Sequence, residues 1–128
     1  MKYYCHSRYA SFKFAFAGLK RLGREHNFRI HIIIATLTTV AGILCGISLI
    51  EWYGIIICFG LVLAAEGFNT AIEILADRIC SCKDESIKLA KDVSAGAVLL
   101  AALSSAVVGG LIFANRLFHI CLLYTSDA

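Results

Sequence analysis

The sequence lacks the motifs with which most soluble proteins hold nucleotide phosphates. It contains neither G-x-x-x-x-G-K-[ST] nor G-x-G-x-x-G, which excludes a P-loop and a dinucleotide-binding fingerprint. It has no proline, and only 16% of its 128 residues are charged. Hydrophobic residues make up 59% of the chain, and the mean hydropathy is +0.79. Because a soluble domain is usually about 45–50% apolar, this excess predicts burial in a membrane.

Patterns typical of disulfide scaffolds and zinc sites are also missing. Cys45 and Cys58 lie inside apolar runs. Cys80 and Cys82 lie in a charged loop that we place in the cytoplasm, where thiols are normally reduced. This pair has no second pair to complete a metal site. We expect the scattered histidines to pack at the membrane interface; they are His6, His26, His31 and His119.

The first 31 residues form a basic, amphipathic segment. They hold seven of the chain's twelve cations, interleaved with apolar residues such as Phe12, Phe16 and Leu19. This pattern is typical of a helix on a membrane surface, with its apolar side toward the lipid tails. The alternative is a leader that merely orients insertion. No secretory signal peptide is expected, because the first uninterrupted apolar run begins only at Ile32.

Three apolar segments follow, each long enough to cross a hydrocarbon core of about 30 Å. We place the crossings at about 32–50, 52–72 and 93–114, within one domain at 32–115. The turn at Glu51 has no Lys or Arg, whereas eleven of the twelve cations fall on the other side, which the positive-inside rule assigns to the cytoplasm. The sequence thus predicts an all-α membrane protein. The tail at 116–128 fits no element, and we expect it to be frayed.

The second apolar segment carries a polar seam, which consists of Glu66, Asn69, Glu73 and Asp77. At about 100° per residue, these side chains fall within about 80° of one helical face. Glu66 lies about 21 Å along the helix from Trp52, inside the hydrocarbon zone, and Glu73 lies near the cytoplasmic interface. An acid at bilayer centre costs about 2.5–3.5 kcal/mol and indicates function. The alternative is a structural acid bonded to a neighbouring helix.

Two further charged groups fall at the membrane level of Glu73. Glu25–His31 precedes the first crossing, and Lys91 with Asp92 precedes the third. Acids from two helices beside a lysine suit a magnesium–nucleotide site. Mg²⁺ takes one or two carboxylates with waters and phosphate oxygens, and a lysine neutralises phosphate charge. The alternatives are an ion pair between Glu25 and Arg29 and membrane anchoring by Lys91.

These motifs resemble the signatures of the prokaryotic diacylglycerol kinases and the related undecaprenol kinases. The motifs are Glu66–Glu73 (EGFNTAIE) with Asp77 four residues on, Ala90–Leu99 (AKDVSAGAVL) and the Glu25–His31 stretch. The resemblance covers about residues 9–115 in the family's order and spacing. It implies a homotrimer in the bacterial plasma membrane, with a surface helix and three crossings per chain. The active sites of the trimer would be shared between neighbouring subunits.

The resemblance also implies transfer of the γ-phosphate of Mg–ATP to a lipid hydroxyl, in phospholipid or lipid-carrier metabolism. Glu66 would be the general base, and Asn69 would orient the base region. Glu25 and Glu73 would hold Mg²⁺, and Asp77 would support the seam. The implied nucleotide contacts are Cys82, Lys83, Asp84, Lys91 and Asp92, with Glu25 and Glu73 acting through the metal. No nucleic-acid partner is expected.

The identity of the lipid stays open between undecaprenol and diacylglycerol. Ala95-Gly96, after the second motif, and Glu51-Trp52, at the outer turn, resemble the undecaprenol-kinase branch more closely. A small transporter that uses Glu66 as an intramembrane carboxylate is a competing function, but such sites usually lie near the bilayer midplane. A non-catalytic adaptor is another, but it would not need acids from two segments and a lysine at one membrane level.

Overall fold

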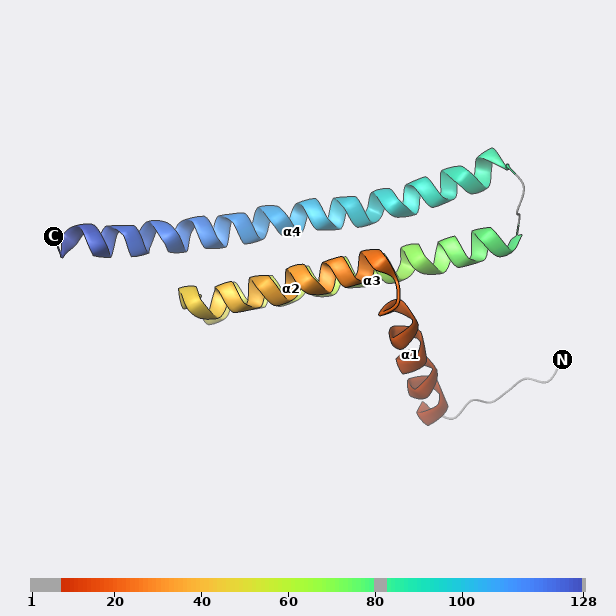
Figure 1. The fold of residues 1–128 in the computed structure, drawn as a ribbon, viewed down its shortest axis with the longest axis horizontal. Helices are drawn as coiled ribbons and strands as arrows, with labels where there is room; N and C mark the ends of the chain where they lie inside the picture. The colour runs from red at the N-terminus through yellow and green to blue at the C-terminus, as the bar shows by residue number, and fades with distance from the viewer. Residues whose placement is uncertain (1–7, 80–82, 128) are drawn as a thin grey trace.

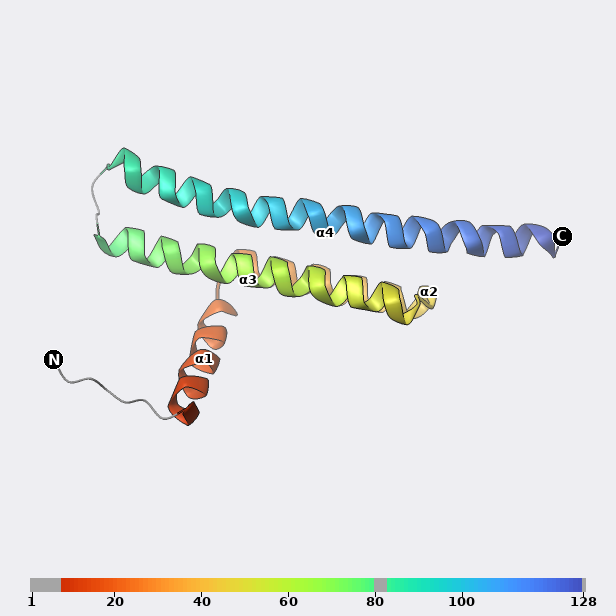
Figure 2. The same ribbon diagram turned by 180° about the vertical axis from the view of Figure 1, so that it is seen from behind.

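The fold is a bundle of long helices. The computed structural model describes residues 8–79 and 83–127, and all regular structure within them is α-helical, which confirms the predicted all-α class. These helices are α1 (Arg8–Leu22), α2 (His26–Cys45), α3 (Leu49–Ile79) and α4 (Glu85–Ser126). Figure 1 shows α2, α3 and α4 side by side, with α1 crosswise to them. The view from behind in Figure 2 shows the same arrangement.

Three of the described helices, α2, α3 and α4, are long and apolar enough to cross a membrane. Their lengths are 20, 31 and 42 residues. At 1.5 Å per residue, α3 is about 46 Å long and α4 about 63 Å, so both exceed a hydrocarbon core of about 30 Å. Most of their large apolar side chains are exposed, as a lipid environment permits. The chain is a multi-pass membrane protein, as predicted.

The first hairpin turns earlier than expected. α2 runs from His26 to Cys45, whereas the expected crossing was 32–50. The chain turns at 46–48 and not at Glu51, because Gly46 takes a left-handed conformation (φ 63°) that glycine adopts readily at a helix C-terminus. The N–H groups of Gly46 and Ile47 then donate to carbonyls in the last turn of α2.

Glu51 belongs to the first turn of α3, where it closes a capping box. Its Oε2 accepts a hydrogen bond from the Ser48 backbone N–H at 2.6 Å, and its own N–H donates to Ser48 Oγ at 3.3 Å. This reciprocal pair satisfies two otherwise unbonded groups at the helix start. The same carboxylate accepts from Arg116 of α4 at 2.9 Å. One acid therefore fixes the turn and joins it to α4.

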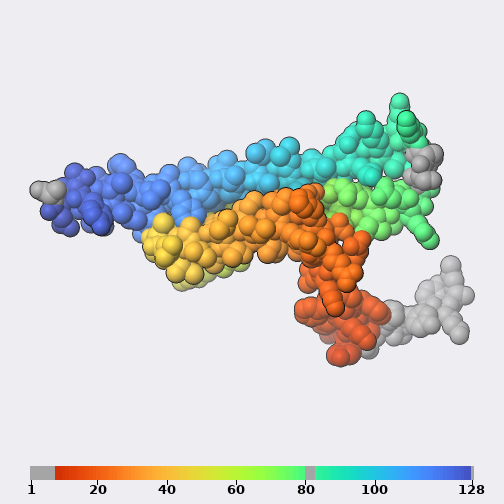
Figure 3. Space-filling model, in the orientation of Figure 1, coloured from red at the N-terminus to blue at the C-terminus, as the bar shows by residue number. Residues whose placement is uncertain are grey.

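The C-terminal segment is helical, which differs from the frayed tail expected at 116–128. α4 continues to Ser126, and Asp127 caps it. Neither glycine nor proline occurs after Gly110, so no residue there carries the strong helix-breaking penalty of these two types. In Figure 3 the end of α4 extends well past the turn between α2 and α3.

The hairpin between α2 and α3 depends on a close approach at Gly42. A Cβ atom at this position would lie 2.9 Å from Trp52 Cη2 and 3.0 Å from Ile47 Cδ1. Gly42 and Ile47 are buried. Any larger side chain would therefore force α2 and α3 apart beside the turn.

We expect Gly42→Leu to destabilise the bundle by about 1–3 kcal/mol, the usual cost of overpacking. Gly60→Leu is the matched control, because an added Cβ at Gly60 meets nothing within 4 Å. The measurement is the thermal midpoint of purified protein in micelles, followed by circular dichroism. Equal midpoints for the two variants would show that the contact with Trp52 does not constrain the hairpin.

Candidate functional site

The polar seam of α3 runs from the protein interior into the solvent. Glu66 and Asn69 are buried, with 3% and 4% of their surface exposed, and Thr70 beside them is buried as well. Glu73 is half-buried, and the side chain of Asp77 is 70% exposed. The structure thus orders the four predicted seam residues by depth along a single helix.

α4 supplies hydrogen-bond partners for the buried part of the seam. Ser94, itself buried, donates from Oγ to Asn69 Oδ1 at 2.7 Å. The Asn69 amide nitrogen in turn donates to Glu73 Oε1 at 3.2 Å. Because an amide has one accepting and one donating end, Ser94 fixes which end of Asn69 faces Glu73. The Lys91 carbonyl, 2.8 Å from Ser94 Oγ, is a second acceptor for the same hydroxyl.

Lys91 joins α4 to the solvent end of the seam. Its Nζ donates to Asp77 Oδ1 at 2.8 Å. The ammonium thus pairs with a carboxylate on the neighbouring helix, and the alternative of membrane anchoring by Lys91 stays untested.

α2 brings a histidine to the deepest acid. His31 Nε2 lies 3.9 Å from Glu66 Oε2, and the side chains are 19% and 4% exposed. Interfacial packing was the expected role for all four histidines, but this one faces the buried carboxylate. The separation is too long for a direct hydrogen bond.

Glu25 lies at the N-terminus of α2, where it pairs with Arg21 at 3.0 Å. The expected alternative, a pair with Arg29, is wrong because the Arg29 guanidinium donates to the carbonyls of Gly23 and Arg24. Glu25 and Glu73 both lie close enough to Glu66 for their charges to interact with its carboxylate. The charge on Glu66 is therefore influenced by one acid at the start of α2 and by one on its own helix.

The donor set at this place suits a hard cation more than zinc. The described residues hold no cluster of three or more His, Cys, Asp or Glu side chains that would bind a metal by itself. Mg²⁺ needs only one or two carboxylates, since waters and phosphates fill its other positions. Glu25 and Glu73 supply two carboxylates, and that number meets the requirement.

The remaining predicted nucleotide contacts lie around the start of α4. Asp84 caps α4 by accepting from the backbone N–H groups of Ser86 and Ile87 at 2.8 and 3.1 Å. Lys83 and Asp92 are exposed, and Cys82 lies outside the described residues. The structure therefore leaves Lys83, Asp84 and Asp92 outside the buried part of the site.

Two residues of the site were missed from the sequence. Ser94 lies in the Ala90–Leu99 motif but was given no role in the site, and His31 was expected at the membrane interface. Ser94 lies three residues after Lys91, so a helical repeat places both on one side of α4. That repeat was the available signal for Ser94. The contact of His31 with Glu66 depends on how α2 packs against α3, which the periodicity of one helix does not show.

We expect Ser94→Ala to lower the free energy of unfolding by about 1–3 kcal/mol, because it leaves the buried Asn69 carbonyl without its donor. Ser104→Ala is the control on the same helix, since the exposed Ser104 hydroxyl bonds only to the Leu100 carbonyl of its own helix. The measurement is the thermal midpoint in micelles. A loss no larger than that of Ser104→Ala would mean that the Ser94 bond adds nothing to the joint between α3 and α4.

The chain is similar to known lipid kinases over most of its length. The profile of the prokaryotic diacylglycerol kinase family matches residues 13–113. The undecaprenol kinase of Bacillus subtilis (strain 168) is 37% identical over 110 residues, which cover 85% of this chain and 89% of that protein. A diacylglycerol kinase of Synechocystis sp. is 36% identical over 102 residues, covering 78% of this chain and 58% of that protein. A diacylglycerol kinase of Sinorhizobium sp. is 34% identical over 91 residues, covering 71% and 66%.

The matched residues include the whole polar seam and its partners on α2 and α4. They confirm the resemblance that the seam and the Ala90–Leu99 motif suggested, and they decide for a kinase over a transporter or an adaptor. The chain belongs to the prokaryotic diacylglycerol kinase family and is a lipid kinase of that family.

Proposed function

We propose that the chain transfers the γ-phosphate of Mg–ATP to the hydroxyl of undecaprenol at the seam of α3. The observation that carries the proposal is the order of depth along the seam, from Glu66 with 3% of its surface exposed to Asp77 with a 70% exposed side chain. The buried end meets a lipid hydroxyl, and the exposed end meets ATP from the water. The 37% identity to an undecaprenol kinase supports this lipid, and diacylglycerol is the alternative.

Glu66 is the proposed general base. It takes the proton of the lipid hydroxyl while the oxygen attacks the γ-phosphorus, and ADP leaves with the electron pair of the broken P–O bond. Such a transfer depends on positioning and on charge stabilisation more than on covalent chemistry. Asn69 serves the positioning, because Ser94 holds its amide toward Glu73.

Glu25 and Glu73 are the proposed Mg²⁺ ligands. The proposal is supported by the charge that both carboxylates exert on Glu66. Bound there with ATP, Mg²⁺ would neutralise charge on the phosphate oxygens. Arg21 holds Glu25 at 3.0 Å, and Asn69 holds Glu73 at 3.2 Å. Each proposed ligand therefore has a partner that orients it.

Lys91 is the proposed phosphate contact on α4, with Asp77 keeping its ammonium at the seam. Further nucleotide contacts come from the start of α4, where Asp84 fixes the first turn by its cap. The residues proposed for this part of the site are Cys82, Lys83, Asp84 and Asp92. Of these, Lys83 and Asp84 lie at the start of α4 and are exposed, and Cys82 lies outside the described residues.

We propose further that the active site faces the cytoplasm and that three chains form a trimer with shared sites. The distribution of cations supports the orientation. The many exposed large apolar side chains of α2, α3 and α4 leave surface for neighbouring subunits as well as for lipid. α1 lies crosswise to the spans (Figure 1), as a helix on the membrane surface would.

The test is a parallel assay of purified protein in micelles. Transfer of ³²P from [γ-³²P]ATP is measured to undecaprenol and to diacylglycerol, with Mg²⁺ present. We expect label in undecaprenol at the higher kcat/KM. Label only in diacylglycerol would overturn the choice of lipid, and label in neither would overturn the proposed reaction.

We expect Glu66→Gln to lower kcat by at least about 100-fold, the usual contribution of a general base, with ATP binding retained. Asp127→Asn is the matched control, because Asp127 is exposed and follows the end of α4. The measurements are the rate of transfer per folded protein and the binding of ATP by equilibrium dialysis. Full activity of Glu66→Gln would refute the assignment of the base.

We expect Glu73→Gln to raise the KM for Mg–ATP by at least about tenfold, because the loss of groups around a bound metal costs about 10–100-fold in affinity or activity. The KM for the lipid should change little, since Glu73 lies at the water side of the seam. The measurement is a titration of activity with Mg²⁺ at fixed ATP. An unchanged Mg²⁺ dependence would contradict the ligand assignment.

A further inference from the structure

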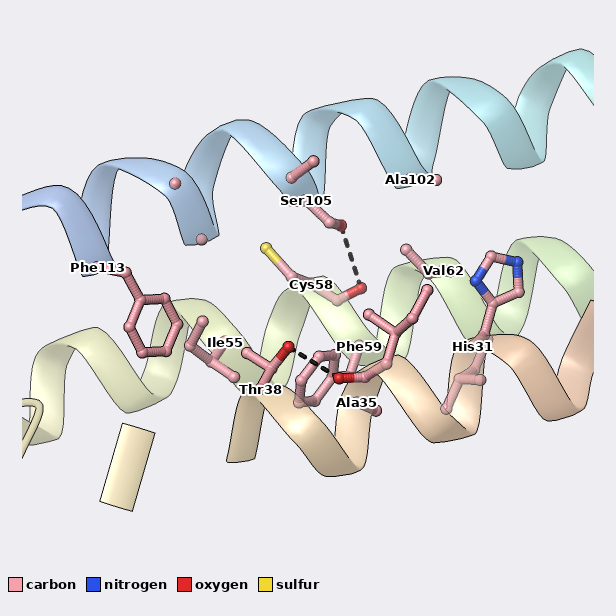
Figure 4. Close-up of a pocket in the computed structure, with 15 residues that line it drawn as sticks. His31, Ala35, Thr38, Ile55, Cys58, Phe59, Val62, Ala102, Ser105 and Phe113 are labelled. Carbon is pink, nitrogen blue, oxygen red and sulfur yellow. Dashed lines mark hydrogen bonds between the residues drawn. The ribbon is translucent and has the colours of Figure 1, made fainter. Parts of the chain in front are cut away.

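A narrow apolar groove of about 350 Å³ runs between α2, α3 and α4. Figure 4 shows side chains of all three helices turned into it, from Phe113 at one end to His31 at the other. On α4 its wall extends from Ala102 to Phe113, which is about 16 Å at 1.5 Å per residue. The groove is therefore long and thin, and it lies within the membrane-spanning part of the bundle.

The α3 wall of the groove leads directly to Glu66. Ile55, Phe59 and Val62 line the groove, and Glu66 follows Val62 by four residues, one helical turn further on the same face. His31 lines the groove from α2 and lies 3.9 Å from Glu66. The apolar space thus ends at the imidazole of His31, beside the acid that we propose as the base.

The hydroxyl groups in the groove wall are already bonded. Thr38 Oγ1 donates to the Ile34 carbonyl at 2.8 Å, and Ser105 Oγ donates to the Cys58 carbonyl at 3.4 Å. Figure 4 shows both bonds as dashed lines. The wall therefore offers an apolar surface along its length, with His31 as the polar group at its end.

We propose that this groove holds a single hydrocarbon chain of the lipid alcohol and that His31 and Glu66 together hold its hydroxyl. The inference rests on the proposed function. It adds a binding site for the hydrocarbon chain of the lipid, and it adds His31 as a second contact to the lipid hydroxyl. A volume of 350 Å³ over a length of about 16 Å leaves a cross-section too small for an α-helix, which is about 10 Å across with its side chains. Two acyl chains side by side are too thick as well. The geometry therefore favours an alcohol at the end of one linear chain.

The distance between His31 and Glu66 suits one bridging hydroxyl. An oxygen atom makes good hydrogen bonds at about 2.8 Å, and 3.9 Å between Nε2 and Oε2 is less than twice that length. The imidazole N–H donates to the lipid oxygen, and the lipid hydroxyl donates to Glu66. In the transfer the proton moves to Glu66, the oxygen bonds to the γ-phosphorus, and the bond to ADP breaks. His31 keeps the oxygen in place throughout.

The first test compares His31→Gln with His31→Leu. Glutamine keeps an N–H donor at about the reach of imidazole Nε2, whereas leucine fills the space without a donor. We expect His31→Leu to lower kcat/KM for undecaprenol about 10- to 100-fold, the usual effect of a misplaced reactant, with the KM for ATP unchanged. His31→Gln should stay within about threefold of the wild type. His119→Leu, at the far end of α4, is the control.

The outcomes separate the inference from the proposed function. No transfer by the wild type to any alcohol would overturn the proposed function itself. If the wild type transfers phosphate and His31→Leu does so at the same rate, only the role of His31 would be overturned. Equal losses in His31→Leu and His31→Gln, or a raised KM for ATP in both, would show that the imidazole serves packing and not the hydroxyl.

The second test fills the groove. Ala106 lines it, and Ala101 lines a separate cavity on the other side of α3 and α4. We expect Ala106→Leu to raise the KM for undecaprenol about tenfold while the KM for ATP stays constant, and Ala101→Leu to change neither. Equal lipid KM values for the two variants would overturn the chain site. A wild-type preference for dioleoylglycerol over undecaprenol would overturn its limit to one chain.

Discussion

The structure depends on one constraint, which is that polar groups on a helix within lipid must be satisfied by a neighbouring helix. The buried polar side chains of the seam on α3, Glu66 and Asn69, need such partners. Ser94 of α4 donates to the buried Asn69, and α2 places His31 beside the buried Glu66. At the solvent end of the seam, Lys91 of α4 pairs with Asp77 at 2.8 Å. These contacts fix the rotation of three helices about one line of side chains. The seam therefore contributes to the register of the bundle, together with the close packing at Gly42.

The far end of the bundle has a separate joint. Glu51 caps α3 through Ser48 and also binds Arg116 of α4. The turn itself is set by the left-handed Gly46. Seam and joint are separated along α3 by the length of the groove, so the three helices are held at both ends while the wall between them stays apolar. That arrangement leaves space for the proposed hydrocarbon chain of the lipid while the acidic side chains keep their positions.

The sequence predicted those features that depend on one helix at a time. The offsets of Glu66, Asn69 and Glu73 fix a common face, and hydropathy marks the three long helices, as the structure has them. Features that depend on two helices were not predictable. The pairing of Ser94 with Asn69 requires the relative rotation of α3 and α4, and the early turn requires the backbone of Gly46. The same holds for His31, whose neighbour lies 35 positions away in the chain.

The proposed site couples the lipid and the acid through one face of α3. Ile55, Phe59 and Val62 form an apolar wall, and Glu66 is its next position toward the solvent end. A residue inserted between Val62 and Glu66 would turn the acid by about 100°, away from the groove, from His31 and from α4 together. The position of Glu66 relative to the apolar wall is therefore fixed by the number of residues between Val62 and Glu66. A hydrocarbon chain that lies along this wall therefore has its terminal hydroxyl at Glu66. No further contact is needed to position the hydroxyl.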